Sequence, residues 1–452
     1  MAGRAAFRLF RSIQTPAAHS MNQETLPNVV LVDGGRIPFQ RAGTLYRNRT
    51  AYDLARRAVA SLLMRHPGLA DRIEQVDLGT VIQDVDTSNL AREAALGSGL
   101  PASVPARTHT MACVSANAAV AAVHDAIRLG NIRLGLAAGA ETMSDVPIRL
   151  SRPMRQALLR ARSAKGAGGL LKAFKGWKPS HLAPAIPAIT EFSSGESMGQ
   201  SADRMARRYG VGRDEQDRFA VRSHQLAHAA REIGHTSFGG EWLDAADAPD
   251  FASVDRENGI RPDTGVEQLG RLRPVFERKD GTITAGNASF LTDGASAALL
   301  AEESMARENG LPVLARIKGF RFDARDPRED LLMGPALSIP RLLRDLGLTM
   351  GDIDVIELHE AFAAQVLCLL RALDSKDYFR EHHPGMAPTG APDPDRVNAW
   401  GGSLAVGHPF GATGIRIMCT AARRLHAEDG KLALIASCAA GGQSHAMVLE
   451  RI

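Results

Sequence analysis

The chain has 452 residues, of which 44% are hydrophobic, so it can bury a substantial core and disorder is excluded as its main state. At roughly 150 residues per domain, this length predicts about three domains. The formal net charge of +4 gives no reason to expect a nucleic-acid partner, and the apolar stretches fall short of the ~18 residues that a membrane-spanning helix needs. Four scattered cysteines without a CxxC pair favour reduced thiols over a disulfide framework or a zinc site.

Residues 1–27 form an extension with a basic character. No acidic residue precedes Glu24, and Arg4, Arg8 and Arg11 share one face of a predicted amphipathic helix. This composition is typical of a mitochondrial transit peptide and lacks the long apolar core of a secretory signal. The alternatives are a disordered bacterial extension or a true start at Met21.

From residue 28 onward, short apolar strands alternate with helical segments, which is typical of an α/β protein. We predict strands at 29–32, 75–82, 134–139 and 431–436, and helices at 51–64, from about 112, and at 415–425. The helix after residue 112 is rich in alanine nearly all round, so we expect it to be buried between layers. A similar order of turn, helix and strand recurs near the C-terminus, which indicates two related halves.

Residues 146–190 are strongly polarised, with nine Lys or Arg residues, no Asp or Glu, and apolar residues between them. Such a segment can lie on an anionic membrane, dock a partner or attract a polyanionic ligand, and the alternative is a solvated loop over the core. A helix is predicted at 213–234 and a loop at 251–265. An inserted segment of this length between the two predicted halves indicates a cap or a third subdomain.

Cys113 lies where a loop gives way to a helix, and the positive helix end is expected to lower its pKa and favour the thiolate. The alternative is a small buried residue. His408 lies in a segment with five glycines between 401 and 414, where it can act as a base or an oxyanion donor, or merely cap a turn.

Cys438 follows an apolar strand and precedes a glycine pair, where backbone N–H groups can converge on an oxyanion, although a thiol there can also simply pack. His359 and Glu360 occupy another strand-to-helix junction, where an acidic residue is also ordinary helix capping. No P-loop or GxGxxG motif follows the first strand, which disfavours phosphoryl and hydride transfer. Two loop cysteines and a loop histidine suit acyl transfer through a thioester.

Eight blocks spread over nearly the whole chain from residue 28 together resemble the thiolase family. They are GRIPF at 35–39, CVSAN at 113–117, GAETMS at 139–144, SMGQSAD at 197–203, GTITAGNASFLTDGASA at 281–297, HEAFA at 359–363, GGSLAVGHPFGATG at 401–414 and CAAGGQSHAM at 438–447. The resemblance implies an α/β fold with five layers, αβαβα, made of two repeated βαβαβαββ halves and an inserted loop domain. It implies an N-terminal half at 28–145 and 286–310, a loop domain at 146–285, and a C-terminal half at 311–452.

The same resemblance implies catalytic roles. Cys113 is implied to be the acylated nucleophile, His408 to activate it and help hold the thioester oxygen, and Cys438 to exchange the proton at the α-carbon. The backbone N–H groups of Cys113 and Ala440 are implied to be oxyanion donors. The family usually has glycine at position 440, so Ala440 requires a backbone with negative φ or tolerated strain.

His359 stands where many thiolases have asparagine, and this form resembles the β subunit of the trifunctional fatty-acid β-oxidation complex and its bacterial relatives. It implies that His359 positions a water, or donates directly, in the first oxyanion hole. The resemblance implies no metal and no covalently bound cofactor, with coenzyme A as co-substrate. The implied contacts for substrate and coenzyme A are Met198, Arg261, Phe276, Ser289, Met333 and Phe362.

The function we expect is acyl transfer: cleavage of a long-chain 3-oxoacyl-CoA with CoA in fatty-acid β-oxidation. The alternatives are an acetoacetyl-CoA thiolase, a decarboxylating ketoacyl synthase, which the second loop cysteine disfavours, or a membrane- or partner-docking scaffold with residual thiolysis. Expected partners besides the substrates are a second copy in a homodimer or higher oligomer, a hydratase/dehydrogenase α subunit, and an anionic membrane surface contacted by 146–190. The expected location is the mitochondrial matrix, associated with the inner membrane, and the alternative is the bacterial cytoplasm.

Overall fold

The computed structural model describes residues 26–185, 190–235, 254 and 256–452. The predicted targeting extension at 1–27 therefore lies almost entirely outside the described residues. Part of the predicted loop at 251–265 also lies outside them, and its described residues form no helix or strand.

The first half is built on five strands in the order β4-β3-β5-β8-β1. β3 runs parallel to β4 and β5, whereas β8 runs antiparallel to β5 and β1. β1 and β5 are buried along their whole length, because both faces of the sheet are covered. The strands are β1 (Val29–Arg36), β3 (Gln75–Gly79), β4 (Ala106–His109), β5 (Leu134–Glu141) and β8 (Thr292–Glu302), and the short β2 (Gln40–Arg41) pairs with β8.

The second half repeats this pattern in the order β10-β11-β12-β9, with one parallel pair, β10 and β11, followed by antiparallel pairs. Its strands are β9 (Ala315–Ala324), β10 (Val355–Leu358), β11 (Leu432–Ala439) and β12 (Gln443–Glu450). The two halves join where Val30 and Leu31 of β1 pair with Arg316 and Ala315 of β9. The predicted repeat of two related halves is confirmed.

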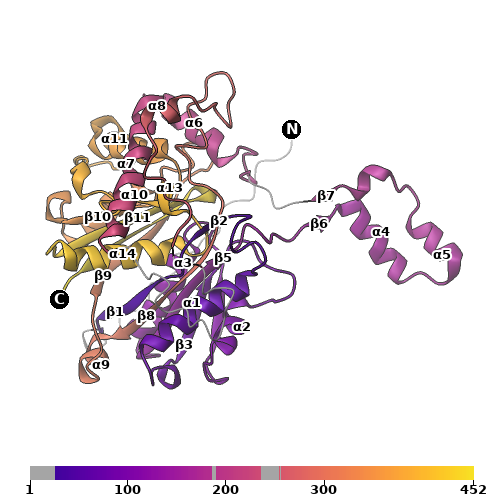
Figure 1. Ribbon diagram of the computed structural model, residues 1–452, viewed down its shortest axis with the longest axis horizontal. Helices are drawn as coiled ribbons and strands as arrows, with labels where there is room; N and C mark the ends of the chain where they lie inside the picture. Colours follow the sequence, from indigo (N-terminus) through magenta and orange to yellow (C-terminus); the bar gives the residue numbers. More distant parts are fainter. Residues whose placement is uncertain (1–25, 186–189, 236–253, 255) are drawn as a thin grey trace, which may run out of the picture.

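Helices cover both halves and fill the space between them, which gives five layers (Figure 1). One core lies under α1 (Ala51–Arg65) and α2 (Leu90–Gly97), and a second under α10 (Pro335–Leu346) and α11 (Ala363–Asp374). The third core lies between the sheets around α3 (Ser115–Arg128) and α14 (Thr413–Ala427), which contact each other. Small side chains such as Ala116 and Ala119 allow this close approach, so the helix predicted to be buried between layers is confirmed.

Local sequence explains where these helices begin. Thr50 and Asp53 form a capping box that starts α1 at the predicted position. α3 starts at Ser115, about three residues later than predicted, because Ala112 has a left-handed φ of 47° and Val114 is the non-helical N-cap. The turn before α3 therefore belongs to the site rather than to the helix.

The segment between β5 and β8 contains two distinct parts. In the first, β6 (Arg149–Leu150) and β7 (Pro184–Ala185) form the base of a hairpin of α4 (Arg152–Arg162) and α5 (Gly166–Ala173), which projects away from the body (Figure 1). In the second, α6 (Met198–Arg208), α7 (Arg213–Glu232) and α8 (Val266–Gly270) pack against the second half. The remaining helices are α9 (Glu303–Glu308), α12 (Lys376–His382) and α13 (Ser403–Val406). Within the described ranges, no helix is both long and apolar enough to span a membrane.

Candidate active site

Cys113 lies in the short turn between β4 and α3. The hydroxyl of Ser115 accepts a hydrogen bond from the Met111 N–H at 2.8 Å and donates to the Ala112 carbonyl at 2.7 Å. These bonds close the turn around Ala112, whose φ of 47° is unusual for a residue other than glycine. The strained backbone is held by Ser115 and presents Cys113 at a fixed position.

Burial dominates the acidity of Cys113. It raises the pKa of the thiol to about 11, and hydrogen bonds from the backbone N–H groups of Ala440 and of Cys113 itself offset this only in part. The expectation that the helix end lowers this pKa is therefore wrong, because the loss of solvation outweighs the helix N-terminus. The resting thiol is protonated at neutral pH.

Cys438 is the last residue but one of the buried strand β11 and lies next to Cys113. Burial raises the pKa of the Cys438 thiol, and the neighbouring Cys113 raises it further. The chain then turns through Ala440, whose φ is not left-handed, whereas Gly441 and Gly442 have φ values of 77° and 70°. Ala440 therefore avoids the left-handed φ that would strain an alanine. The N–H of Ala440 points at the Cys113 sulfur.

His359 and His408 form a second pair, with ring centroids 4.0 Å apart. His359 directly follows β10, and its N–H donates to the Ala436 carbonyl at 2.8 Å. His408 lies in the loop between α13 and α14, where its N–H donates to the Thr292 hydroxyl at 3.0 Å. Burial lowers the pKa of His408 to about 3 and holds that of His359 well below its usual value, so both rings are neutral.

Hydrogen bonds assign the tautomer of His408. The Thr413 hydroxyl donates to the Pro409 carbonyl at 3.0 Å, and its oxygen lies 2.7 Å from Nδ1 of His408. With its proton committed to Pro409, the hydroxyl accepts from Nδ1–H. Nε2 of His408 then carries a lone pair, has no hydrogen-bond partner among the described residues, and is suited to act as a base.

Glu141 ties the segment after β3 to the loop that holds His408. Its buried carboxylate accepts from the backbone N–H groups of Val81, Ile82 and Gly411, each at 3.0 Å, and its charge acts on Cys113. Burial raises the pKa of Glu141 to about 7. Since Gly411 lies three residues after His408, this carboxylate fixes the His408 loop relative to the segment after β3.

The glycine-rich segment is needed where α14 meets α3. A Cβ on Gly414 would lie 2.2 Å from Oδ1 of Asn117, in the first turn of α3. The N-termini of the two central helices therefore approach each other directly, with Cys113 before one and His408 before the other.

Glu360 has a structural role different from capping. Its carboxylate accepts from Asn398 at 2.7 Å, from Ser223 at 2.8 Å and from the backbone N–H of Leu404 at 3.1 Å. α11 begins after Phe362 without a side-chain cap, so Glu360 does not cap it. It instead binds α7 and α13 to the end of β10.

Four of the expected coenzyme A contacts lie together beside α11. Phe276 and Phe362 make an edge-to-face contact with centroids 6.1 Å apart, and Met198 packs against the same core. Ser289 donates from its N–H and its hydroxyl to the Ala361 carbonyl, both at 3.0 Å. Met333 is fully buried in this core, so it packs below the surface and has no exposed side chain to contact a ligand.

Arg261 belongs to a separate basic cluster that also contains Arg41. Its N–H donates to Nδ1 of His224 at 3.2 Å, and its charge acts on Arg41, which lies 4.3 Å above the ring of Phe290. Arg41 was not found from the sequence, because a lone arginine far from position 261 carries no signal of that proximity. Phe290 directly follows Ser289 in the sequence. The basic cluster of Arg41 and Arg261 is therefore adjacent to the four expected coenzyme A contacts beside α11.

Comparisons with known proteins agree with this geometry. The thiolase N-terminal domain model matches residues 29–304, and the thiolase C-terminal domain model matches residues 311–451. The chain belongs to the thiolase family. The family resemblance and the α/β five-layered fold expected from the sequence are confirmed.

Relatives and solved structures of this thiolase cover nearly its whole length. It is 44% identical over 440 residues to the rat "Trifunctional enzyme subunit beta, mitochondrial", covering 97% of this chain and 91% of that protein. It is 40% identical to the "3-ketoacyl-CoA thiolase" of Klebsiella pneumoniae, covering 93% and 96%. Two structures at 28% identity cover 94% of this chain: a Bacillus anthracis acetyl-CoA acetyltransferase (99% of that chain, TM-score 0.78) and a human mitochondrial 3-ketoacyl-CoA thiolase in complex with CoA (98%, TM-score 0.76).

Proposed function

We propose that this thiolase is an acyltransferase of fatty-acid β-oxidation that cleaves 3-oxoacyl-CoA with coenzyme A, giving acetyl-CoA and a shortened acyl-CoA. The observation that carries the proposal is a pair of adjacent protonated thiols, the half-buried Cys113 and the buried Cys438, in a site with two adjacent buried neutral imidazoles, His359 and His408. The names of the rat and Klebsiella relatives, at 44% and 40% identity, support the 3-ketoacyl-CoA substrate class.

In the first half-reaction, Nε2 of His408 takes the Cys113 proton as the sulfur attacks the 3-keto carbon. The oxyanion receives hydrogen bonds from the backbone N–H groups of Cys113 and Ala440. Nε2–H of His359, directly or through a water, forms the first oxyanion hole, which holds the thioester oxygen of the departing acetyl-CoA unit. The bond between C2 and C3 then breaks, the carbonyl re-forms as a thioester on Cys113, and acetyl-CoA leaves as an enolate that takes the proton of Cys438.

In the second half-reaction, the Cys438 thiolate removes the proton of the incoming CoA thiol, which restores Cys438. The CoA sulfur attacks the acyl group, and the bond to Cys113 breaks. The Cys113 sulfur recovers its proton from His408, so both thiols and the imidazole end as they began. Coenzyme A is a co-substrate in this cycle, and Met198, Phe276, Ser289, Phe362 and Arg261 are the side chains proposed to hold it.

The decisive experiment measures acetyl-CoA release from 3-oxohexadecanoyl-CoA and from acetoacetyl-CoA, with added CoA. We expect faster cleavage of the long-chain substrate and no detectable cleavage by Cys113→Ala. Cys368→Ala is the matched control, because Cys368 is a buried thiol within α11 and outside the site. Preference for acetoacetyl-CoA would instead assign the activity named for the Bacillus anthracis structure, and an inactive but folded wild type would favour the scaffold.

We further propose that the hairpin of α4 and α5 docks on an anionic membrane surface. It carries the cations of residues 146–190 and exposes several leucines, among them Leu159 and Leu171, whose side chains are 65% and 77% exposed. Cations beside exposed apolar side chains are what an interfacial segment needs. This hairpin projects from the body, which leaves both faces free to approach a bilayer (Figure 1).

Sedimentation with vesicles containing anionic lipid tests this docking. We expect binding at low salt that falls at high salt, and a loss of binding for Leu159→Gln with Leu171→Gln. Leu96→Gln is the control, because Leu96 is an exposed leucine on α2 in the body. Binding that persists in the double variant, or none at low salt, would contradict the proposal.

We propose a homodimer or higher oligomer located in the mitochondrial matrix, in a complex with a hydratase/dehydrogenase α subunit at the inner membrane. The name of the rat relative, a mitochondrial subunit beta, supports the location and the partner, whereas the Klebsiella relative fits the bacterial alternative. Light scattering of the purified chain tests the oligomer, which should have at least twice the 48.3 kDa of one chain. Co-purification with the α subunit tests the complex.

A further inference from the structure

Two side chains behind His359 form a chain of hydrogen bonds that the catalytic cycle has not used. Nδ1 of His359 lies 3.0 Å from the Ser403 hydroxyl oxygen, and that oxygen lies 2.7 Å from Nη2 of Arg416. All three residues are buried, with at most 3% of their surface exposed. Ser403 starts α13 and Arg416 lies in the first turn of α14. The two hydrogen bonds therefore connect the residue after β10 to α13 and α14.

The donor inventory of these groups decides the direction of each bond. A guanidinium can only donate, so Ser403 accepts from Arg416. Among the described residues, the only other partner of the Ser403 oxygen is Nδ1 of His359, which is therefore the only acceptor for the hydroxyl proton. The reverse arrangement, with Nδ1–H donating to Ser403, would leave a buried hydroxyl proton without an acceptor.

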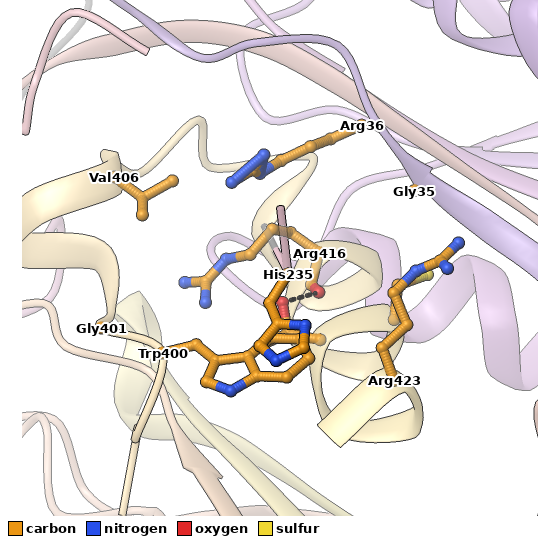
Figure 2. A pocket seen from close by; sticks show the side chains of 10 residues that line it. Gly35, Arg36, His235, Trp400, Gly401, Val406, Arg416 and Arg423 are labelled. Carbon is orange, nitrogen blue, oxygen red and sulfur yellow. Dashed lines mark hydrogen bonds between the residues drawn. The ribbon is translucent and has the colours of Figure 1, made fainter. Parts of the chain in front are cut away.

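Arg416 strengthens this arrangement. Burial lowers its pKa to about 10, so it stays charged at neutral pH, with Oε2 of Glu357 at 3.9 Å. A hydroxyl that accepts from a cation becomes a stronger donor and a weaker acceptor, because hydrogen bonds in a chain polarise one another. Figure 2 shows that Arg416 lines a small cavity together with Arg36 and Trp400. The backbone carbonyl of Arg416 accepts a hydrogen bond from the Thr420 hydroxyl at 3.0 Å.

We propose that Ser403 and Arg416 are positioning residues that hold His359 with its proton on Nε2, the opposite tautomer from His408. The two Nε2 atoms then have complementary tasks: that of His408 is a base, and that of His359 is a fixed hydrogen-bond donor. This assignment rests on the proposed thiolysis for its catalytic meaning, although the tautomers themselves exist without substrate. It also explains why two neutral imidazoles 4.0 Å apart do not compete for one role.

Imidazole ¹⁵N–¹H correlation spectra of the ¹⁵N-histidine-labelled full chain, without substrate, test the tautomers directly. We expect the Nε2–H pattern for His359 and the Nδ1–H pattern for His408, assigned by His359→Asn and His408→Asn. In Ser403→Ala the His359 signal should change to a mixed or Nδ1–H pattern, and Ser403→Thr, which keeps the hydroxyl, should restore it. An Nδ1–H pattern for His359 in the wild type would overturn the proposal.

Kinetics test the consequence for catalysis. Ser403→Ala should lower kcat by about 10- to 100-fold, with KM changed less than about threefold, because a transition-state donor is lost rather than substrate binding. Arg416→Gln, which keeps a neutral donor, should lower kcat less. Ser338→Ala, a fully buried serine on α10, is the matched control and should leave both constants unchanged. Wild-type kcat in Ser403→Ala, or a lower kcat with an unchanged His359 pattern, would contradict the positioning role.

These readouts separate the two proposals. A wild type without thiolysis but with the expected tautomers would contradict the function and leave the assignment of His359 standing. An active wild type with Nδ1–H on His359 would do the reverse.

Discussion

At the scale of single residues, burial rather than charge pairing sets the protonation state of Cys113. The pKa of Cys113 is raised to about 11 and that of His408 is lowered to about 3, so proton transfer between them is unfavourable in the resting enzyme. In the proposed cycle, the Cys113 thiolate forms only when an acyl substrate brings a carbonyl that can take up the charge. A resting thiol of this kind differs from a preformed thiolate–imidazolium pair.

This state predicts how Cys113 reacts with iodoacetamide. Below its raised pKa, the thiolate fraction increases about tenfold per pH unit, so the alkylation rate should rise steadily from pH 7 to pH 9. Mass spectrometry of the peptide that contains Cys113 measures this rate. Cys438 should react more slowly, because its pKa is raised further. A plateau between pH 6 and pH 8 would indicate an ion pair and contradict the prediction.

The sequence alone located the residues that lie at strand ends and in glycine-rich turns: Cys113, His359, His408 and Cys438. It mispredicted the direction of the Cys113 pKa, because a helix start is visible in the sequence whereas burial is not. It found neither Ser403 nor Thr413, since ordinary hydroxyl residues acquire a role only when distant segments meet.

At the scale of elements, the turn between β11 and β12 sets the geometry around both thiols. Cys438 lies one residue before the end of β11, Ala440 directs its N–H at Cys113, and Gly441 and Gly442 take the left-handed conformations. The Gly442 carbonyl also accepts from the Arg325 N–H at 3.0 Å. A family glycine at 440 is therefore dispensable here, whereas the two following glycines are not.

Substitutions in this turn should separate these positions. In Gly442→Ala the new Cβ would lie 2.4 Å from the Arg325 carbonyl oxygen at a φ of 70°, so we expect a loss of at least about 1–2 kcal/mol in unfolding free energy. Activity should fall with it, because the turn carries Ala440. Ala440→Gly should change the unfolding free energy by less than about 1 kcal/mol. Urea unfolding and thiolysis assays measure both, and a Gly442→Ala variant as stable as the wild type would contradict the prediction.

The elements around the site were also predictable to different degrees. The strands near 75–79, 134–141 and 432–439 and the helices near 51–65, 115–128 and 413–427 follow from their apolar patterns, because each contributes to a core between layers. The helix α2 and the strand β4 were not predicted. The projecting form of the α4–α5 hairpin did not follow, since a basic amphipathic pattern is compatible with either packing on the body or leaving it. The division into halves at 28–145 with 286–310, an inserted 146–285, and 311–452 stays a prediction.

At the scale of the whole molecule, a partly buried ion cluster joins the first half to α14 of the second half. Asp33 lies on β1, and its carboxylate contacts Arg65 of α1 at 2.9 Å, His66 at 3.0 Å and Arg423 of α14 at 3.1 Å. Burial alone would raise the pKa of Asp33, but His66, Arg65 and Arg423 together lower it below its ordinary 3.8. The folded state therefore holds the ionised carboxylate more strongly than the unfolded chain does.

This linkage fixes the sign of the pH dependence. Because the folded pKa is depressed, the stabilisation is fully present above pH 3.8 and is lost only as the pH falls through the folded pKa. Asp33→Asn should thus lower the unfolding free energy by about 1–2 kcal/mol at pH 7, since it removes the carboxylate that binds the partly exposed Arg65 and Arg423 side chains. The deficit should be the same at pH 5 and shrink below pH 3.8.

Urea unfolding of both proteins at pH 7, 5 and 3.5 measures this difference. Asp377→Asn is the control, because Asp377 is exposed and its ion pair among the described residues is with Arg380 of the same helix, so we expect no measurable change. Since Asp33 bridges α1 and α14, its loss should also weaken the coupling of the halves and broaden the unfolding transition. A deficit that already disappears between pH 7 and pH 5 would show that Asp33 titrates well above its ordinary pKa, and the cluster would then not stabilise its ionised form.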